Sequence, residues 1–321
     1  MDTSHGDAQT VQVAVYLKEA AAPYRERLVD GDGVSFVFCS TESELRQAMA
    51  HADILLCSSP PPPDAVCAAS SLRWIQAAAA GVDALHAVGL PPDGVALTRI
   101  AEGFGEPIAE YVLGHLLAIA QRVEAVHRHQ AERAWVPFEA ELLGGQTMGV
   151  AGVGAVGKVV AERGAAMGMR TVGLARSPGE LALFEHVYGE DQLEAFLSEL
   201  DVLVLCLPLT PRTRHLIGPR ELGMLKRSCI LVNVARGAVI DEAALIDALD
   251  RGRIRAAVLD VFEQEPLPAD SPLWSMDNVT ITPHHSGLNR PAMIAEFFLD
   301  NLARYRSGRP LRGVVQASRG Y

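Results

Sequence analysis

The sequence predicts an α/β protein built from two doubly wound, parallel-sheet domains. Short apolar and β-branched runs alternate with helical patterns along the chain, which indicates repeated strand–helix–strand units. The length of 321 residues is about twice that of a usual domain. One of the later apolar runs leads into a glycine-rich turn that opens a helix, as in doubly wound sheets.

The first series of predicted strands covers the first hundred residues. We expect these strands at 11–16, 34–38, 54–57, 72–75 and 95–98, separated by helical patterns such as residues 42–50. The prolines at 60–63 predict a stiff connector, because consecutive prolines fix φ and remove backbone donors. Residues 106–130 then have the pattern of one long helix, with Pro107 in its first turn and one apolar face.

A second series of strands follows the long helix. We expect its six members at 147–150, 171–174, 202–205, 230–234, 256–259 and 279–282. A last helix is predicted at 291–304, and we expect it to pack back on the first domain. The intervening helical segments favour a doubly wound sheet for the second half.

The composition is that of a globular protein with an acidic surface. Apolar residues make up 49% of the chain and charged residues 21%, and the formal net charge is −11. Phosphate backbones bind to basic surfaces, so we expect no nucleic-acid partner. The short arginine-rich run at 251–255 is interpreted as solvated helix ends.

The cysteines and the apolar segments bear on the compartment. The five cysteines are an odd number without a CxxC pair, which suits a reducing environment. The first residues lack the features of a signal peptide, and the longest apolar stretch, 111–120, contains His115 and is too short to span a bilayer. We therefore expect a cytoplasmic protein with no membrane partner. The histidines show no metal-ligand spacing, and we expect no metal.

The glycine turn has the spacing of a phosphate-binding loop. Gly152, Gly154 and Gly157 follow the apolar strand at 147–150 and open a helix. In such loops the first glycine permits the tight turn, the second lets a pyrophosphate approach the backbone, and the third allows close helix–sheet packing. The turn therefore predicts a dinucleotide cofactor.

The end of the next strand indicates which dinucleotide is bound. An acidic residue there would accept the ribose hydroxyls of NAD, but this chain has Ala175, Arg176 and Ser177. The guanidinium and the hydroxyl can instead bind a 2′-phosphate. We expect NADP to be preferred, with NAD as the alternative if Arg176 is only an exposed arginine.

Three polar residues lie just past predicted strands of the second half. Arg236, Glu265 and His284 follow the strands at 230–234, 256–259 and 279–282, and the carboxyl ends of parallel strands line the ligand crevice of such sheets. A guanidinium can bind a carboxylate, and an imidazole next to a carboxylate can exchange a proton near neutral pH. The set predicts reduction of a 2-keto acid or the reverse oxidation, with His285 as the competitor of His284.

Taken together, these motifs resemble the D-isomer-specific 2-hydroxyacid dehydrogenase family over nearly the whole chain. The similar stretches are the glycine loop, the segments at 207–210, 233–237, 260–262 and 265–266, and Thr282-Pro283-His284. The pattern is most similar to glyoxylate/hydroxypyruvate reductases. The resemblance implies a substrate-binding domain of residues 1–104 and 286–321, flavodoxin-like, into which a Rossmann dinucleotide-binding domain of residues 105–285 is inserted. It also implies a homodimer.

The resemblance further implies the roles of individual residues. The catalytic set falls on Arg236, Glu265 and His284. The substrate is bound by Arg236, His284 and the backbone amides of Ala79, Ala80 and Gly81. The cofactor is expected to contact Gly152, Gly154, Ala155, Val156, Gly157, Ala175, Arg176, Ser177, Leu207, Pro208, Thr213, Val234, Ala235, Asp260 and His284.

Two other functions fit the same residues. A dinucleotide-sensing regulator, similar to a corepressor, can use this fold and retain a catalytic set. An enzyme of the same superfamily could instead act on an unusual acid, such as phosphite or a long-chain 2-keto acid. The acidic charge and the absence of low-complexity arms argue against the regulator.

Overall fold

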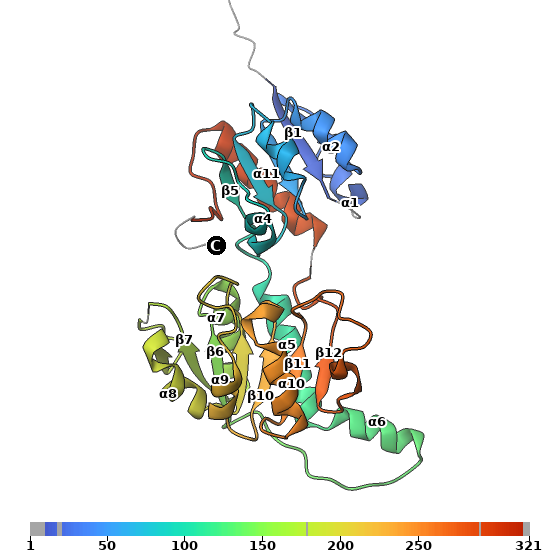
Figure 1. The fold of residues 1–321 in the computed structure, drawn as a ribbon, viewed down its shortest axis with the longest axis vertical. Coiled ribbons are helices and arrows are strands. Elements are labelled where there is room, and N and C mark those ends of the chain that lie inside the picture. The colour runs from blue at the N-terminus through green and yellow to red at the C-terminus, as the bar shows by residue number, and fades with distance from the viewer. Residues whose placement is uncertain (1–9, 18–20, 178, 289, 317–321) are drawn as a thin grey trace, which may run out of the picture. The chain divides into compact units, whose positions relative to one another are not determined.

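The computed structural model describes residues 10–17, 21–177, 179–288 and 290–316. The chain divides into two compact units (Figure 1), which are described separately below. Unit 1 combines Met1–Gly103 with Asn289–Tyr321, and unit 2 is Phe104–Leu288.

Unit 1 contains a five-stranded sheet in which all pairs are parallel. The strand order is β2-β1-β3-β4-β5, which is that of flavodoxin-like sheets. The strands are β1 (Val11–Tyr16), β2 (Val34–Phe38), β3 (Ile54–Cys57), β4 (Trp74–Ala77) and β5 (Ala96–Thr98). The helices are α1 (Ala21–Arg25), α2 (Glu42–Met49), α3 (Pro63–Cys67), α4 (Asp83–Ala87) and α11 (Pro291–Arg306).

Helix α11 joins unit 1 through buried contacts. Phe298 stacks on the fully buried Trp74 of β4, with ring centroids 5.3 Å apart. The Asn301 side chain, also buried, donates hydrogen bonds to the Gln76 side chain (3.2 Å) and to the Arg312 carbonyl (3.0 Å). The prediction that the C-terminal helix packs back on the first domain is therefore confirmed.

Unit 2 contains a seven-stranded parallel sheet of order β12-β11-β10-β9-β6-β7-β8. This is the Rossmann order with one further strand at an edge. The strands are β6 (Thr147–Ala151), β7 (Arg170–Leu174), β8 (His186–Tyr188), β9 (Val202–Leu205), β10 (Ile230–Asn233), β11 (Ala256–Leu259) and β12 (Val279–Ile281). The helices are α5 (Gly105–Ala120), α6 (Val123–Ala131), α7 (Ala155–Ala166), α8 (Leu193–Ser198), α9 (Pro219–Met224) and α10 (Glu242–Asp250), and three short 3-10 turns lie at Glu190–Gln192, Gly237–Val239 and Pro272–Ser275.

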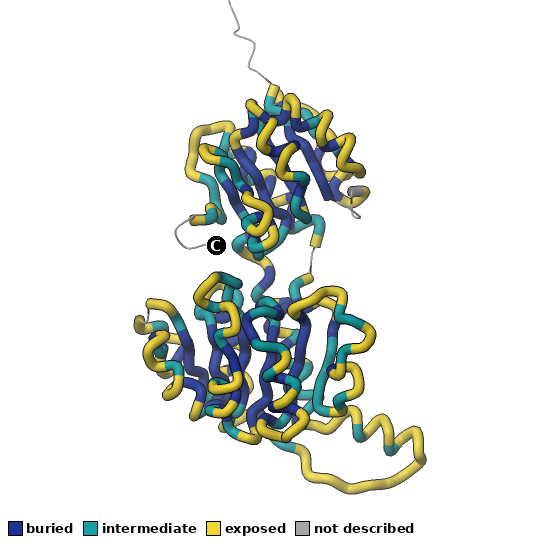
Figure 2. Tube along the Cα trace, in the orientation of Figure 1, coloured by how far each residue is buried: buried dark blue, intermediate teal, exposed yellow. Residues whose placement is uncertain are grey.

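The central strands of both sheets are buried, as the dark tubes in Figure 2 show. In unit 2, every residue of β6, β9, β10 and β11 is buried. Strands covered on both faces carry continuous apolar runs rather than alternating ones, which is why the sequence marked them so clearly. No described helix is long and apolar enough to cross a membrane.

Three sequence predictions of local structure need correction. The long helix at 106–130 is two helices, because Arg122 takes a left-handed conformation (φ 50°) between α5 and α6. The fourth strand begins at Trp74 rather than at Leu72, whose amide still closes the turn after α3 by donating to Ala69. Strand β8 was missed because Val187 is the one buried residue of its three, so the sequence shows no apolar run there.

Candidate active site

The turn after β6 contains two glycines at positions where a side chain does not fit. Gly152 has a φ of 101°, and an added Cβ would lie 2.8 Å from the carbonyl oxygen of Cys206. A Cβ on Gly157, in the first turn of α7, would lie 2.0 Å from the carbonyl oxygen of Gly152. Helix α7 is therefore packed directly against the end of β6, and this approach requires glycine.

Gly154 is constrained in neither way. Among the residues that the structure describes, none lies within 4 Å of a Cβ at this position, and the φ and ψ of −78° and −162° suit any residue. Gly154 is also the N-cap of the twelve-residue helix α7, and as a glycine it supplies no side-chain cap. A helix N-terminus presents amide donors and partial positive charge. The open approach and the uncapped amides fit the pyrophosphate of a dinucleotide.

The end of β7 adjoins this turn. The Gly152 amide donates to the carbonyl of Leu174, the last residue of β7, at 2.9 Å. Arg176 and Ser177, which follow Ala175, are exposed, and within the described residues no carboxylate pairs with Arg176. An exposed guanidinium at this place can bind a 2′-phosphate.

The loop after β9 is closed by its own threonines. The Thr213 hydroxyl donates to the Pro208 carbonyl at 2.6 Å and accepts from the Thr210 amide at 2.8 Å. Leu207 and Pro208 are half-buried, as is Val234, which follows β10 and donates its amide to Leu205. The Thr213 side chain therefore stabilises the shape of this loop, and its predicted contact with a cofactor stays a prediction.

The loop that carries Arg236 is shaped by two neighbouring residues. Asn233 at the end of β10 is buried; its amide group donates to the Arg236 carbonyl (3.1 Å), and its Oδ1 accepts from the Ala235 amide (3.0 Å). The Arg236 guanidinium donates to the Ala235 carbonyl at 2.6 Å. A Cβ on Gly237 would lie 1.8 Å from the carbonyl carbon of Phe262, so this loop lies against the backbone that follows β11.

The structure brings Glu265 and His284 together. Glu265 Oε2 lies 2.8 Å from His284 Nδ1, and Glu265 Oε1 accepts a hydrogen bond from the Phe262 amide at 3.1 Å. The Glu265 side chain is 36% exposed and that of His284 48%. Because the carboxylate engages Nδ1, Nε2 is the ring nitrogen left to exchange a proton with a bound substrate. Phe262 connects this pair to the Arg236 loop.

Asp260 holds the backbone of the histidine loop. Its fully buried carboxylate accepts from the hydroxyls of Thr282 (2.6 Å) and Ser286 (2.5 Å) and from the amides of His285 (2.9 Å) and Ser286 (3.0 Å). The His284 amide donates to the Asp260 carbonyl at 2.9 Å. Burial opposes ionisation, but these hydrogen bonds outweigh it and lower the pKa of Asp260. The Asp260 carboxylate makes all of these hydrogen bonds to the loop at 282–286. Its predicted contact with the cofactor stays a prediction.

The predicted substrate loop belongs to unit 1. Ala79, Ala80 and Gly81 lie between β4 and α4 and are half-buried. The Ala79 carbonyl accepts from the Ile100 amide at 3.0 Å, and the Ala80 carbonyl accepts from Arg99 at 3.4 Å. Within the described residues, the amides at 79–81 have no acceptor in the protein. Such amides can bind a carboxylate, so this loop retains its predicted role as a prediction.

Comparison with known proteins identifies the family. The sequence profile of the D-isomer specific 2-hydroxyacid dehydrogenase, NAD binding domain, matches residues 113–286, which is more than half of the chain. The chain belongs to the D-isomer specific 2-hydroxyacid dehydrogenase family. It is an NAD(P)-dependent dehydrogenase, as its motifs indicated.

Individual relatives of the dehydrogenase agree with this family. Glyoxylate/hydroxypyruvate reductase A of Yersinia enterocolitica is 32% identical over 267 residues, 81% of this chain and 85% of that protein. D-3-phosphoglycerate dehydrogenase of Methanocaldococcus jannaschii is 35% identical over 260 residues. These residues are 79% of this chain but only 49% of that protein, so the match covers about half of its length. The solved structure of NADPH-dependent glyoxylate/hydroxypyruvate reductase from Sinorhizobium meliloti, in complex with NADP and sulfate, has a TM-score of 0.89 and 28% identity, with 97% of this chain and 100% of that chain covered.

Sequence reasoning missed several residues that shape the site of this dehydrogenase. Asn233 and Thr282 stood inside recognised motifs, but nothing local showed that their side chains hold the Arg236 and His284 loops. Tyr111 was counted only as part of an apolar helix face, although its hydroxyl contacts Thr282. A polar residue at the end of a buried strand is the one signal that could have pointed to Asn233 and Thr282.

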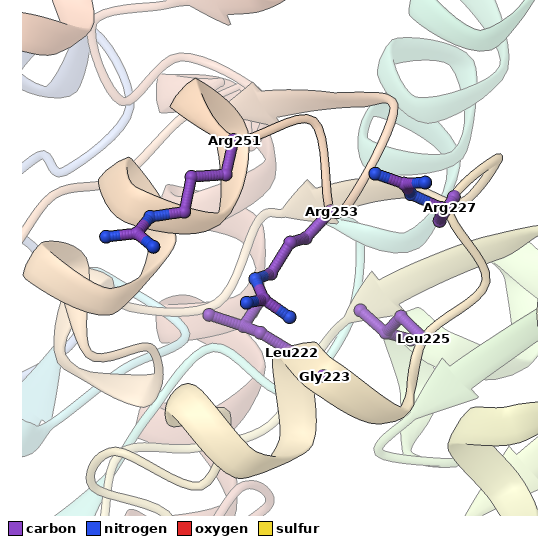
Figure 3. A pocket seen from close by; sticks show the side chains of 6 residues that line it. All are labelled: Leu222, Gly223, Leu225, Arg227, Arg251 and Arg253. Carbon is purple, nitrogen blue, oxygen red and sulfur yellow. The ribbon is translucent and has the colours of Figure 1, made fainter.

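A separate hollow of about 340 Å³ lies away from these loops (Figure 3). Arg227 and Arg253 precede β10 and β11, so they lie at the amino-terminal edge of the sheet, whereas the candidate site of the dehydrogenase is at the carboxyl edge. Both are exposed, as is Arg251 at the end of α10, which agrees with solvated ends of helices and loops. The hollow is lined by Leu222, Gly223, Leu225, Arg227, Arg251 and Arg253.

Proposed function

We propose that this dehydrogenase reduces a small 2-keto acid of the glyoxylate or hydroxypyruvate type to the D-2-hydroxy acid, with NADPH as the preferred cofactor. The observation that carries the proposal is the contact of 2.8 Å between Glu265 and His284. This pair follows strands of the same parallel sheet whose carboxyl edge carries the glycine turn and Arg236. The names of the Yersinia and Sinorhizobium relatives support the substrate type.

In the proposed mechanism each side chain has a distinct task. Bound NADPH supplies the hydride that reduces the carbonyl carbon. His284, oriented through Nδ1 by Glu265, donates a proton from Nε2 to the developing alkoxide. The contact between Glu265 Oε2 and Nδ1 keeps the ring in this orientation during the transfer. The Arg236 guanidinium binds the substrate carboxylate and polarises the carbonyl oxygen.

The preference for NADPH rests on the end of β7. Arg176 and Ser177 are exposed there, and no carboxylate is present at residues 175–177. The Sinorhizobium reductase, which binds NADP, supports the same choice. KM values for NADH and NADPH with one keto acid test it, and a clear preference for NADH would contradict the role given to Arg176.

A panel of 2-keto acids, followed by NADPH absorbance, tests the proposed activity. We expect glyoxylate or hydroxypyruvate to be reduced with the highest kcat/KM. His284→Ala should lower kcat by about 10²–10⁴-fold, as for other acid–base groups, and leave cofactor affinity nearly unchanged. Unchanged turnover in this variant would remove His284 from the mechanism. A wild-type protein that captures peptides and reduces no keto acid would favour the dinucleotide-sensing regulator.

The proposed assembly is a homodimer, in which a second copy covers an exposed arm of unit 2. The arm consists of α6 and residues 132–142, and most of it is exposed in Figure 2. Helix α6 has no buried residue, Trp135 is 95% exposed and Leu142 is 79% exposed. Large exposed apolar side chains grouped in this way mark interaction surfaces. Sedimentation of the wild type and of Trp135→Ala tests this, and a monomeric wild type would contradict it.

The proposed location is the cytoplasm. All five cysteines are free thiols, and burial raises the pKa of Cys57, Cys206 and Cys229 to about 12. Thiols of this kind are unreactive and persist in a reducing compartment. Fractionation of the native cells, with the chain detected by antibody, would test the location.

A further inference from the structure

A chain of hydrogen bonds connects helix α5 to the histidine loop. The Tyr111 hydroxyl of α5 lies 2.8 Å from the Thr282 hydroxyl, and Thr282 lies 2.6 Å from Asp260 Oδ1. The Thr282 and Asp260 side chains are buried, with Asp260 fully so. Tyr111 is 171 positions from Thr282 in the sequence, so only the tertiary structure brings these groups together.

The direction of these bonds follows from their chemistry. An ionised carboxylate only accepts hydrogen bonds, so Thr282 donates its proton to Asp260. The Thr282 oxygen is then the acceptor, and Tyr111 donates to it. Burial raises the pKa of Tyr111 to about 12, which keeps the phenol protonated, and the pKa of Asp260 is lowered. Tyr111 and Asp260, the two ends of this series of hydrogen bonds, thus have the protonation states that the direction requires.

The same carboxylate fixes the backbone on which His284 stands. Its two oxygens bind the amides of His285 and Ser286, and the Asp260 carbonyl binds the His284 amide. His284 itself has a φ of 52°, a left-handed conformation that few non-glycine residues adopt without support. Asp260 therefore supports the backbone from which the His284 ring projects toward Glu265.

We propose that Tyr111 and Thr282 are positioning residues of the catalytic reaction, which orient the Asp260 carboxylate and, through it, the backbone of His284. The inference rests on the proposed role of His284 as the acid. Within the described residues, the two hydroxyls contact each other and Thr282 contacts Asp260. The two hydroxyls increase the fraction of molecules in which the His284 loop presents Nε2 in the reactive orientation. We therefore expect their loss to lower kcat and to leave cofactor binding unchanged.

The test compares hydroxyl removal at two buried threonines of unit 2. Thr282→Val removes the donor to Asp260, whereas Thr282→Ser keeps a hydroxyl at the same place. Thr171→Val is the matched control. Thr171, at the beginning of β7, is also buried, and its hydroxyl donates to the Leu183 carbonyl at 2.6 Å. Tyr111→Phe removes the other hydroxyl and retains the ring.

We expect Thr282→Val to lower kcat about tenfold, as for the loss of a hydrogen bond to a charged group, with the Kd for NADPH unchanged. Thr282→Ser should restore most of the loss, and Tyr111→Phe should lower kcat by a smaller factor. Thr171→Val should lower the Tm about as much as Thr282→Val does, but it should leave kcat unchanged. The proposal would be overturned if Thr282→Val had the kcat of the wild type. It would also be overturned if Thr282→Val and Thr171→Val lowered kcat by the same factor.

Amide hydrogen exchange separates this proposal from the proposed function. The amides of His285 and Ser286 should exchange about tenfold faster in Thr282→Val and at the wild-type rate in Thr171→Val. An inactive wild type with this exchange pattern would contradict the proposed reaction and support the hydrogen-bond chain. Unchanged exchange in Thr282→Val would overturn the chain, whatever the activity.

Discussion

Gly154→Ala separates cofactor binding from folding, because the structure offers the new methyl group open space. No described residue lies within 4 Å of a Cβ at this position, and the backbone angles are accessible to alanine. The neighbouring glycines do not allow this test. A Cβ on Gly157 would lie 2.0 Å from a carbonyl oxygen, and Gly152 has a φ of 101°, so alanine at either position would disturb the protein itself.

The magnitude follows from what occupies that space. We expect a pyrophosphate at the N-terminus of α7 to approach the backbone of Gly154 directly, so a methyl group there would lengthen at least one amide–phosphate hydrogen bond. A hydrogen bond to a charged group contributes about 1.5–3 kcal/mol, so cofactor affinity should fall by about 10–100-fold. Stability should change by less than about 1 kcal/mol, because two effects of similar size oppose each other: alanine restricts the unfolded chain, which stabilises the protein, and it is a poorer N-cap than glycine, which destabilises it.

The assay is fluorescence titration with NADPH, beside thermal unfolding without cofactor. Gly114→Ala is the control: Gly114 is exposed within α5, and a Cβ there also meets nothing within 4 Å. It should leave NADPH affinity unchanged and stabilise the protein by about 0.5–1 kcal/mol, as expected for glycine replacement inside a helix. A Gly154→Ala protein with wild-type stability and wild-type NADPH affinity would refute the placement of the pyrophosphate at this turn.

Three further predictions concern single side chains. Arg176→Gln should weaken NADPH binding by about 10–100-fold and leave NADH binding nearly unchanged, through loss of charge-assisted bonds to the 2′-phosphate; equal losses for both cofactors, measured as Kd, would contradict this. Glu265→Gln should lower kcat by about 5–30-fold, a value reduced for the partial exposure of the ion pair, with unchanged NADPH affinity; steady-state kinetics would show it, and an unaltered kcat would dismiss the orienting role. Burial, together with the charge of His285, lowers the pKa of His115, and Asp260 opposes this. The unfolded chain therefore binds more protons at His115, so this residue makes the protein less stable as pH falls through about 6.5. His115→Gln should reduce that loss in urea unfolding at about pH 7.5 and pH 5.5, and an unchanged pH dependence would be contrary to expectation.

Much of the fold could be predicted because apolar runs and helical patterns along the sequence indicate its strands and helices. The buried strands of unit 2 carry continuous apolar runs, and parallel sheets with both faces covered require such runs. Strand–helix alternation then predicted two parallel sheets, and the comparisons and the observed strand orders confirm this fold class. The break at Arg122 and the short strand β8 could not be predicted, because neither leaves a periodic signal.

The candidate site divides in the same way between local and distant interactions. The residue types of the glycine turn, Arg236, Glu265 and His284 stand in short motifs, so their chemistry was predictable without coordinates. The 2.8 Å contact between Glu265 and His284 and the buried carboxylate of Asp260 beneath their loop required the fold. Tyr111 shows the limit most clearly: its sequence neighbours mark it as a packing residue, and its hydrogen-bonding partner lies 171 positions away. Periodicity and motifs report interactions between residues close in sequence, whereas the hydrogen bond between α5 and the residue after β12 depends on the whole chain of unit 2.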